Sequence, residues 1–217
     1  MRHTYGKAAR AHPAVTVSEL SVASGGRICL TGGSGSGKST LLSILAGLLV
    51  PTSGAVRLDA LDLFSLGEAQ RDQLRARRIG CVFQTFNLLQ GLSALENLTL
   101  AQRFAGVASA PARARAEQLL EQLGLGQRAS SRPSELSVGE QQRVAIARAV
   151  SNTPGLVLAD EPTASLDDEN AKAAIDLLLD ACRESTLIVA THDQRLVSRF
   201  PSVRAMGELA GPGRGSE

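Results

Sequence analysis

The chain has 217 residues, and its 23 lysines and arginines nearly balance 21 aspartates and glutamates, leaving a formal charge of +2. This length suits one domain with a modest inserted subdomain, and the near-neutral charge, without a basic tract interleaved with aromatic residues, argues against nucleic-acid binding. No signal-peptide core opens the sequence and the longest apolar stretch, residues 41–50, is too short to span a bilayer, so we expect a cytosolic protein whose cysteines, Cys29, Cys81 and Cys182, stay reduced and unpaired.

Apolar runs separated by helical patterns dominate the chain. Four of them, residues 27–31, 79–83, 156–160 and 187–191, predict buried parallel strands. The pattern as a whole predicts a doubly wound α/β sheet that binds ligands beyond the carboxyl ends of its strands. Two weaker alternating segments, 15–22 and 54–58, predict an antiparallel side sheet. The stretch between Gln84 and Pro154 predicts an all-helical insertion, and the Gly-rich tail after Gly207 predicts disorder.

A phosphate-binding loop follows the first strand. The sequence Gly32-Gly33-Ser34-Gly35-Ser36-Gly37-Lys38-Ser39-Thr40, between a strand and an apolar helix, matches Gly-x-x-x-x-Gly-Lys-Ser in its required context. Glycines let successive backbone N–H groups surround phosphate oxygens, Lys38 adds a charge at the β- and γ-phosphates, and Ser39 offers its hydroxyl to Mg²⁺. The loop therefore predicts binding of ATP and Mg²⁺, and the competing explanation is a Gly/Ser linker before a helix.

Four arginines, Arg71, Arg75, Arg77 and Arg78, precede the second strand. Such a cluster faces either acidic lipid headgroups or water. We favour a solvated helix surface, because charge runs of this kind usually form one.

An Ala-rich helix is predicted to begin within Leu136-Ser137-Val138-Gly139-Glu140-Gln141-Gln142-Arg143. Ser137 and Glu140, three residues later, form a capping box, which is enough to explain an ordinary helix start. An exposed helix N-terminus with a hydroxyl and a glycine also suits an anion such as a γ-phosphate. These residues alone leave both interpretations open.

The third strand ends in Asp160 and Glu161, two adjacent carboxylates at the sheet edge that carries the phosphate loop. Asp160 is suited to hold Mg²⁺, directly or through a water molecule, and Glu161 to act as general base on the attacking water. An acidic pair after a strand is most often a loop start or helix cap. The phosphate loop beside it is what favours catalysis here.

Taken in order, these motifs resemble those of one family, the ATP-binding cassette (ABC) ATPases, whose signature Leu-Ser-Gly-Gly-Gln precedes the acidic pair by about the interval seen here. The match covers nearly the whole chain. It implies one P-loop NTPase domain over residues 1–217, with a nucleotide-binding core at 1–85 and 152–217 and a helical signature subdomain at 86–151. It also implies an ATPase whose ATP hydrolysis is coupled to transport.

The resemblance assigns roles to further residues. Gln84 looks like the Q-loop glutamine, which contacts the metal and water, and His192 like the switch histidine at the γ-phosphate. Asp167 looks like the D-loop aspartate. Tyr5, with only four residues before it, is the candidate to stack on adenine.

The resemblance also implies partners. Two chains would pack head to tail, so that Ser137 and Gly139 of one complete the ATP site of the other; Val138, in place of the family's glycine, would oppose this closure. A separate integral membrane permease would hold the chain on the cytoplasmic face of the inner membrane. Residues 81–97 look most like the lipoprotein-release and macrolide-export ATPases. A division-type ATPase that regulates a cell-envelope hydrolase without transport remains the alternative.

Overall fold

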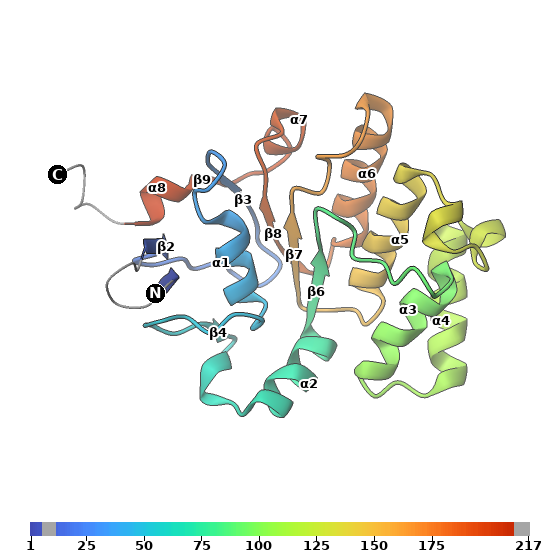
Figure 1. The fold of residues 1–217 in the computed structure, drawn as a ribbon, viewed down its shortest axis with the longest axis horizontal. Helices are drawn as coiled ribbons and strands as arrows, with labels where there is room; N and C mark the ends of the chain where they lie inside the picture. Colours follow the sequence, from blue (N-terminus) through green and yellow to red (C-terminus); the bar gives the residue numbers. More distant parts are fainter. Residues whose placement is uncertain (6–11, 211–217) are drawn as a thin grey trace.

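A computed structural model describes residues 1–5 and 12–210, and its centre is a five-stranded parallel sheet (Figure 1). The strands lie in the order β6-β7-β8-β3-β9. Their bounds are β3 Arg27–Thr31, β6 Ile79–Val82, β7 Leu156–Asp160, β8 Thr186–Ala190 and β9 Val203–Ala205. The first four are the predicted strands, with small shifts at the ends of β6 and β8. The edge strand β9 is not predicted by the sequence pattern, because its three residues form no apolar run.

Helices cover both faces of this sheet (Figure 1). On β7, Leu156 and Leu158 pack in one core with α1 (Lys38–Leu45), while Val157 and Ala159 pack in another with α5 (Val138–Val150) and α6 (Asp168–Ala181). Side chains alternate in this way because successive residues of a strand point to opposite faces. Burial of both faces explains why the strands are continuous apolar runs.

The antiparallel part of the fold consists of two separate hairpins. Strand β1 (Arg2–Tyr5) pairs with β2 (His12–Thr16), and β4 (Arg57–Leu58) pairs with β5 (Leu61–Asp62). The prediction that residues 15–22 and 54–58 form one side sheet is therefore wrong in its pairing. Residues 17–22 form no strand, since the amide of Val17 donates to Met1 and that of Ser18 donates to Leu209, outside any ladder.

The insertion contains α3 (Ala94–Phe104), α4 (Ser109–Gln122), two 3-10 turns, Gly126–Arg128 and Pro133–Glu135, and then α5. The prediction of helix throughout is wrong for residues 84–93, which form a loop. In this loop Phe86 and Asn87 have φ of 59° and 50°, values that end a helical pattern. The buried Asn97 anchors the loop through hydrogen bonds with Leu89, Leu92 and Ser93.

The predicted arginine cluster lies on α2 (Glu68–Arg78), a helix without buried residues that follows the 3-10 turn Leu63–Ser65. Arg75 pairs with Asp72, Arg78 pairs with Asp59, and Arg77 donates to the carbonyl of Ala105. The cluster thus lies on a helix without buried residues and is partly ion-paired, and the solvated surface stays a prediction.

The last described elements are the short helices α7 (Gln194–Val197) and α8 (Met206–Leu209). The prediction of disorder after Gly207 is wrong for residues 208–210, because α8 continues through Leu209, which is buried; the rest of the tail, from residue 211, lies outside the described residues. All three cysteines are free, and burial raises the pKa of Cys29 and Cys81 to about 11 and that of Cys182 to about 12. Within residues 1–5 and 12–210, no helix is both long and apolar enough to cross a membrane.

Candidate active site

The phosphate loop, the acidic pair and His192 meet at the carboxyl ends of three neighbouring strands, β3, β7 and β8. Parallel strands end at the same edge of a sheet, so residues far apart in sequence gather there. The distances that follow show how closely they approach one another.

Two features fit the phosphate loop to an anion. Gly35 and Gly37 have φ of 77° and 90°, and a Cβ on Gly37 would lie 2.3 Å from the carbonyl oxygen of Ala14, so a side chain there would collide with the backbone. The ammonium of Lys38, a residue only 8% exposed, donates to the carbonyls of Gly32 and Gly33 at 2.7 and 3.2 Å. A buried positive charge is thereby held against the loop.

Asp160 is the metal-ligand candidate, and its surroundings fit a divalent cation. Burial raises its pKa, and so does the charge of Glu161, while a hydrogen bond from Ser39 and the charge of Lys38 lower it. Its Oδ1 is buried and has no hydrogen-bond partner among the described residues. Those residues contain no cluster of three or more His, Cys, Asp or Glu able to bind a metal. Mg²⁺ nevertheless suits such a site, because it commonly uses few protein ligands beside phosphate oxygens and water.

Three residues, Thr191, His192 and Lys38, place hydrogen-bond donors or positive charge beside the carboxylate of Glu161. Its Oε2 accepts from the Thr191 hydroxyl at 2.9 Å and from the His192 amide at 3.3 Å, and its Oε1 lies 2.8 Å from His192 Nδ1. Lys38 Nζ lies 3.8 Å from the same Oε1. The backbone of Glu161 has φ of 44°, a strained conformation for a residue other than glycine, and its amide donates to Ala190.

The candidate signature and D-loop residues contact each other rather than the phosphate loop. Ser137 caps α5 through the predicted box with Glu140, at 3.3 and 2.8 Å. A Cβ on Gly139 would lie 2.4 Å from Oδ1 of Asn170, and Asn170 donates twice to Asp167, the cap of α6. In the part of the chain that the structure describes, no hydrogen bond or ion pair joins these residues to Lys38 or Glu161.

The remaining candidates lie at exposed positions. Gln84 is in the turn after β6. Tyr5 ends β1; the residue is 52% exposed, and its ring meets that of His3 edge to face with the centroids 4.7 Å apart. Sequence reasoning missed Thr191, which is fully buried and bonded to Glu161. Its position next to His192 was the available signal.

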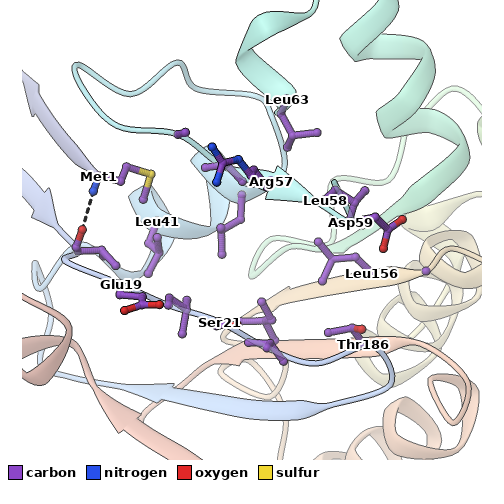
Figure 2. A pocket seen from close by; sticks show the side chains of 18 of the residues that line it. Met1, Glu19, Ser21, Leu41, Arg57, Leu58, Asp59, Leu63, Leu156 and Thr186 are labelled. Atoms are coloured by element: carbon purple, nitrogen blue, oxygen red, sulfur yellow. Dashed lines mark hydrogen bonds between the residues drawn. The ribbon is translucent and has the colours of Figure 1, made fainter. Parts of the chain in front are cut away.

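Two cavities lie apart from this cluster. The first, of about 700 Å³, is lined by Leu156 and Thr186, the first residues of β7 and β8, and so lies toward the opposite edge of the sheet (Figure 2). Figure 2 also shows Met1 at its rim, where the amino terminus donates to the carbonyl of Val17. The second cavity, of about 880 Å³, lies between α2, α3 and α5.

Residues 15–164 match the family described as ABC transporter. The chain belongs to the ATP-binding cassette family. ABC ATPases hydrolyse ATP. The membership of this family, the fold class and the ATPase activity predicted from the sequence are therefore confirmed.

Similar ABC proteins include two named lipoprotein-releasing system ATP-binding protein LolD. That of Xanthomonas euvesicatoria pv. vesicatoria (strain 85-10) is 42% identical over 94% of this chain and 85% of its own. That of Legionella pneumophila (strain Paris) is 44% identical over 88% of this chain and 85% of its own. The uncharacterized ABC transporter ATP-binding protein YbbA of Escherichia coli (strain K12) is 49% identical over 85% and 82%.

A solved ABC structure has the same fold. The cassette MJ0796, determined as a dimer in a post-hydrolysis state bound to ADP and Pi, superposes with a TM-score of 0.85 at 35% identity. The match covers 94% of this chain and 90% of MJ0796. ABC ATPases form dimers and work with membrane subunits.

Proposed function

We propose that this chain is the ATP-hydrolysing subunit of a lipoprotein-release transporter and drives a separate integral membrane permease. The observation that carries the catalytic part is the arrangement of Glu161 between Thr191, His192 and Lys38 at the end of the phosphate loop. The transport part rests on the similarity to the two LolD proteins. Those relatives do not favour a division-type regulator.

In this proposal the phosphates of ATP lie against the amides of residues 32–40, with the charge of Lys38 at the β- and γ-phosphates. Ser39 and Asp160, together with Gln84, would hold Mg²⁺, which neutralises charge on the phosphate oxygens. Glu161 accepts the proton of the attacking water, and His192 lies at the γ-phosphate. The carboxylate is already oriented by its donors, so little reorganisation accompanies the reaction.

A second copy completes the site. Packed head to tail, it would present Ser137 and Gly139 to the γ-phosphate. Asp167 would lie at the same interface, because Asn170, which donates to Asp167, is also packed closely against Gly139. Val138 is 46% exposed on this surface and would oppose closure. Tyr5, exposed at the end of β1, is the proposed adenine contact.

The cavity of about 880 Å³ is the proposed docking groove for the permease. Phe104, which is 69% exposed, and Leu48 give it apolar walls, and Arg148 gives it positive charge, while Arg75 is paired with Asp72, which lines the same cavity. Asn87, in the loop after Gln84, also lines it, so a segment seated there would contact the loop that leads to the ATP site. A chain docked in this way would lie on the cytoplasmic face of the inner membrane.

Replacement of Glu161 by glutamine tests the catalytic assignment. Glutamine keeps the shape of the side chain but is no base at neutral pH, so we expect hydrolysis to fall about 10²- to 10⁴-fold while ATP binding persists and a closed dimer accumulates. ATPase rate, nucleotide binding and size-exclusion chromatography with ATP are the measurements. Glu184→Gln, at an exposed position outside the site, is the control. Hydrolysis by Glu161→Gln at the wild-type rate would remove Glu161 from the role of base.

A further inference from the structure

A row of hydrogen bonds continues outward from Glu161. Thr191 Oγ1 donates to Glu161 Oε2 at 2.9 Å and accepts from the amide of Asp193 at 3.1 Å. One hydroxyl thus joins the backbone of Asp193 to the candidate base. The turn formed by residues 191–193 includes His192, so a group that fixes Asp193 also restrains Thr191 and His192, two of the three residues that contact Glu161.

Asp193 is fixed by two side chains. Arg195 donates to its carboxylate from two nitrogens. Nε lies 3.0 Å from Oδ1 and 3.1 Å from Oδ2, and Nη2 lies 2.7 Å from Oδ2. Thr163, a buried residue on the segment after Glu161, donates to the same carboxylate at 2.7 Å. The contact with Arg195 is the main reason why the pKa of Asp193 is lowered to about 2. The pair therefore stays ionised throughout the working pH range, and its fork geometry specifies an orientation that a point charge would not.

Arg195 also reaches the D-loop. Its remaining nitrogen, Nη1, pairs with Asp168, the first residue of α6. The preceding residue, Asp167, caps that helix and is the D-loop residue placed at the subunit interface above. A continuous path thus runs from Glu161 through Thr191, Asp193 and Arg195 to the start of α6.

We propose that Arg195 is a positioning residue that holds the turn 191–193 against Glu161 and ties this turn to the D-loop. The inference rests on the proposed function, since it takes Glu161 as the base and Asp167 as an interface residue. The inference adds that the base is oriented from the side of the interface, through a side chain whose polar contacts are with Asp193 and Asp168 and not with Glu161.

The molecule supplies a matched control. Arg199 pairs with Asp176 of α6 at 2.8 Å, and so joins the same two parts of the chain with the same residue types. The two arginines are similarly exposed, whereas Asp176 is half exposed and Asp168 is fully exposed. Among the described residues, no hydrogen bond or ion pair carries this second pair on toward Glu161. Loss of either pair removes one bridge between α6 and the segment around α7, but only loss of Arg195 also removes one of the two side chains that fix Asp193.

The test compares Arg195→Gln with Arg199→Gln in the full chain, with ATPase kinetics at saturating ATP and thermal unfolding measured for both. We expect Arg195→Gln to lower kcat about five- to tenfold with the KM for ATP changed less than about twofold, because binding groups stay in place while the base loses its orientation. Arg199→Gln is expected to keep kcat within about twofold. Arg195→Lys should recover only part of the loss, since lysine cannot form the two-nitrogen contact.

The link to α6 has its own readout. Asp168→Asn is expected to lower kcat in the otherwise unchanged chain and to have no further effect in Arg195→Gln, because Asp168 acts only through Arg195. Equal kcat in the Arg195→Gln and Arg199→Gln variants would overturn the inference, as would additive losses for Asp168→Asn. Glu161→Gln belongs in the same series: if it hydrolyses ATP normally the proposed function fails, whereas an inactive Glu161→Gln beside a normal Arg195→Gln refutes the positioning role alone.

Discussion

At the scale of single residues, the buried hydroxyl of Thr191 decides how Glu161 is presented. Thr191→Val keeps the side-chain shape and removes the donor to Oε2, leaving this oxygen with the longer contact to the His192 amide. We expect kcat to fall about tenfold with little change in ATP affinity, because only the orientation of the base is altered. Steady-state ATPase kinetics and a nucleotide-binding titration measure the two effects.

Thr186→Val is the control for that change, since Thr186 begins the strand that leads into Thr191 and its hydroxyl accepts from the amide of Gly25. Equal losses of kcat in the two variants would show that the hydroxyls matter only for the stability of the strand.

At this scale, some site residues could be predicted from the sequence and others could not. Lys38, Asp160 and His192 could be placed at one sheet edge because strand order gathers them there, whereas the role of Thr191 depends on a turn that no pattern specifies.

At the scale of elements, α5 holds the loop that contains Gln84. Arg148 of α5 donates from its two terminal nitrogens to the carbonyls of Phe86 and Asn87, at 2.7 and 2.5 Å, and these are the two non-glycine residues of this loop with positive φ. Such a conformation costs on the order of 1–3 kcal/mol for each residue and persists only where the surroundings enforce it. The guanidinium of Arg148, whose pKa burial lowers, holds both carbonyls in this conformation, and Asn97 holds the part of the loop that follows.

Arg148→Lys should therefore loosen the loop without unfolding the helix. Lysine offers no planar fork to two carbonyls, so we expect amide hydrogen exchange in residues 84–93 to speed up by about tenfold while α3 exchanges as before. Hydrogen–deuterium exchange mass spectrometry measures both segments in one experiment. Arg103→Lys, at an exposed position on α3, provides the comparison, and unchanged exchange in residues 84–93 would contradict the clamp.

This clamp explains the largest error in the sequence-based fold. Asparagine tolerates the left-handed region, so Asn87 is a weak local signal for a break in the helical pattern, but nothing local marks Phe86. A side chain from α5, about sixty residues away, holds the carbonyls of both residues. The prediction of one side sheet is wrong for a similar reason, because strand pairing depends on contacts between segments that the local pattern does not describe. The core strands were predictable because each is buried on both faces, and each therefore forms an apolar run that can be recognised without knowing its neighbours.

At the scale of the whole molecule, the groove between α2, α3 and α5 separates the proposed nucleotide-binding core from the proposed signature subdomain. Phe104 stands exposed on its wall, where a charge would not disturb packed neighbours but would oppose an apolar partner segment. Phe104→Asp is expected to leave the ATPase rate of the isolated chain within about twofold and to reduce recovery of the permease from detergent-solubilised membranes by more than about tenfold.

Leu61→Asp distinguishes loss of docking from a general effect of an added charge. Leu61 is also exposed and lies on β5, and it does not line this groove. If both variants recover a polytopic membrane protein as well as the unaltered chain does, the permease does not dock on Phe104 and the path from the groove through Asn87 to Gln84 is not the route of coupling. If only Phe104→Asp loses it, the same contact that seats the permease reaches the loop clamped by Arg148, and ATP hydrolysis and transport are then joined through one loop of the chain.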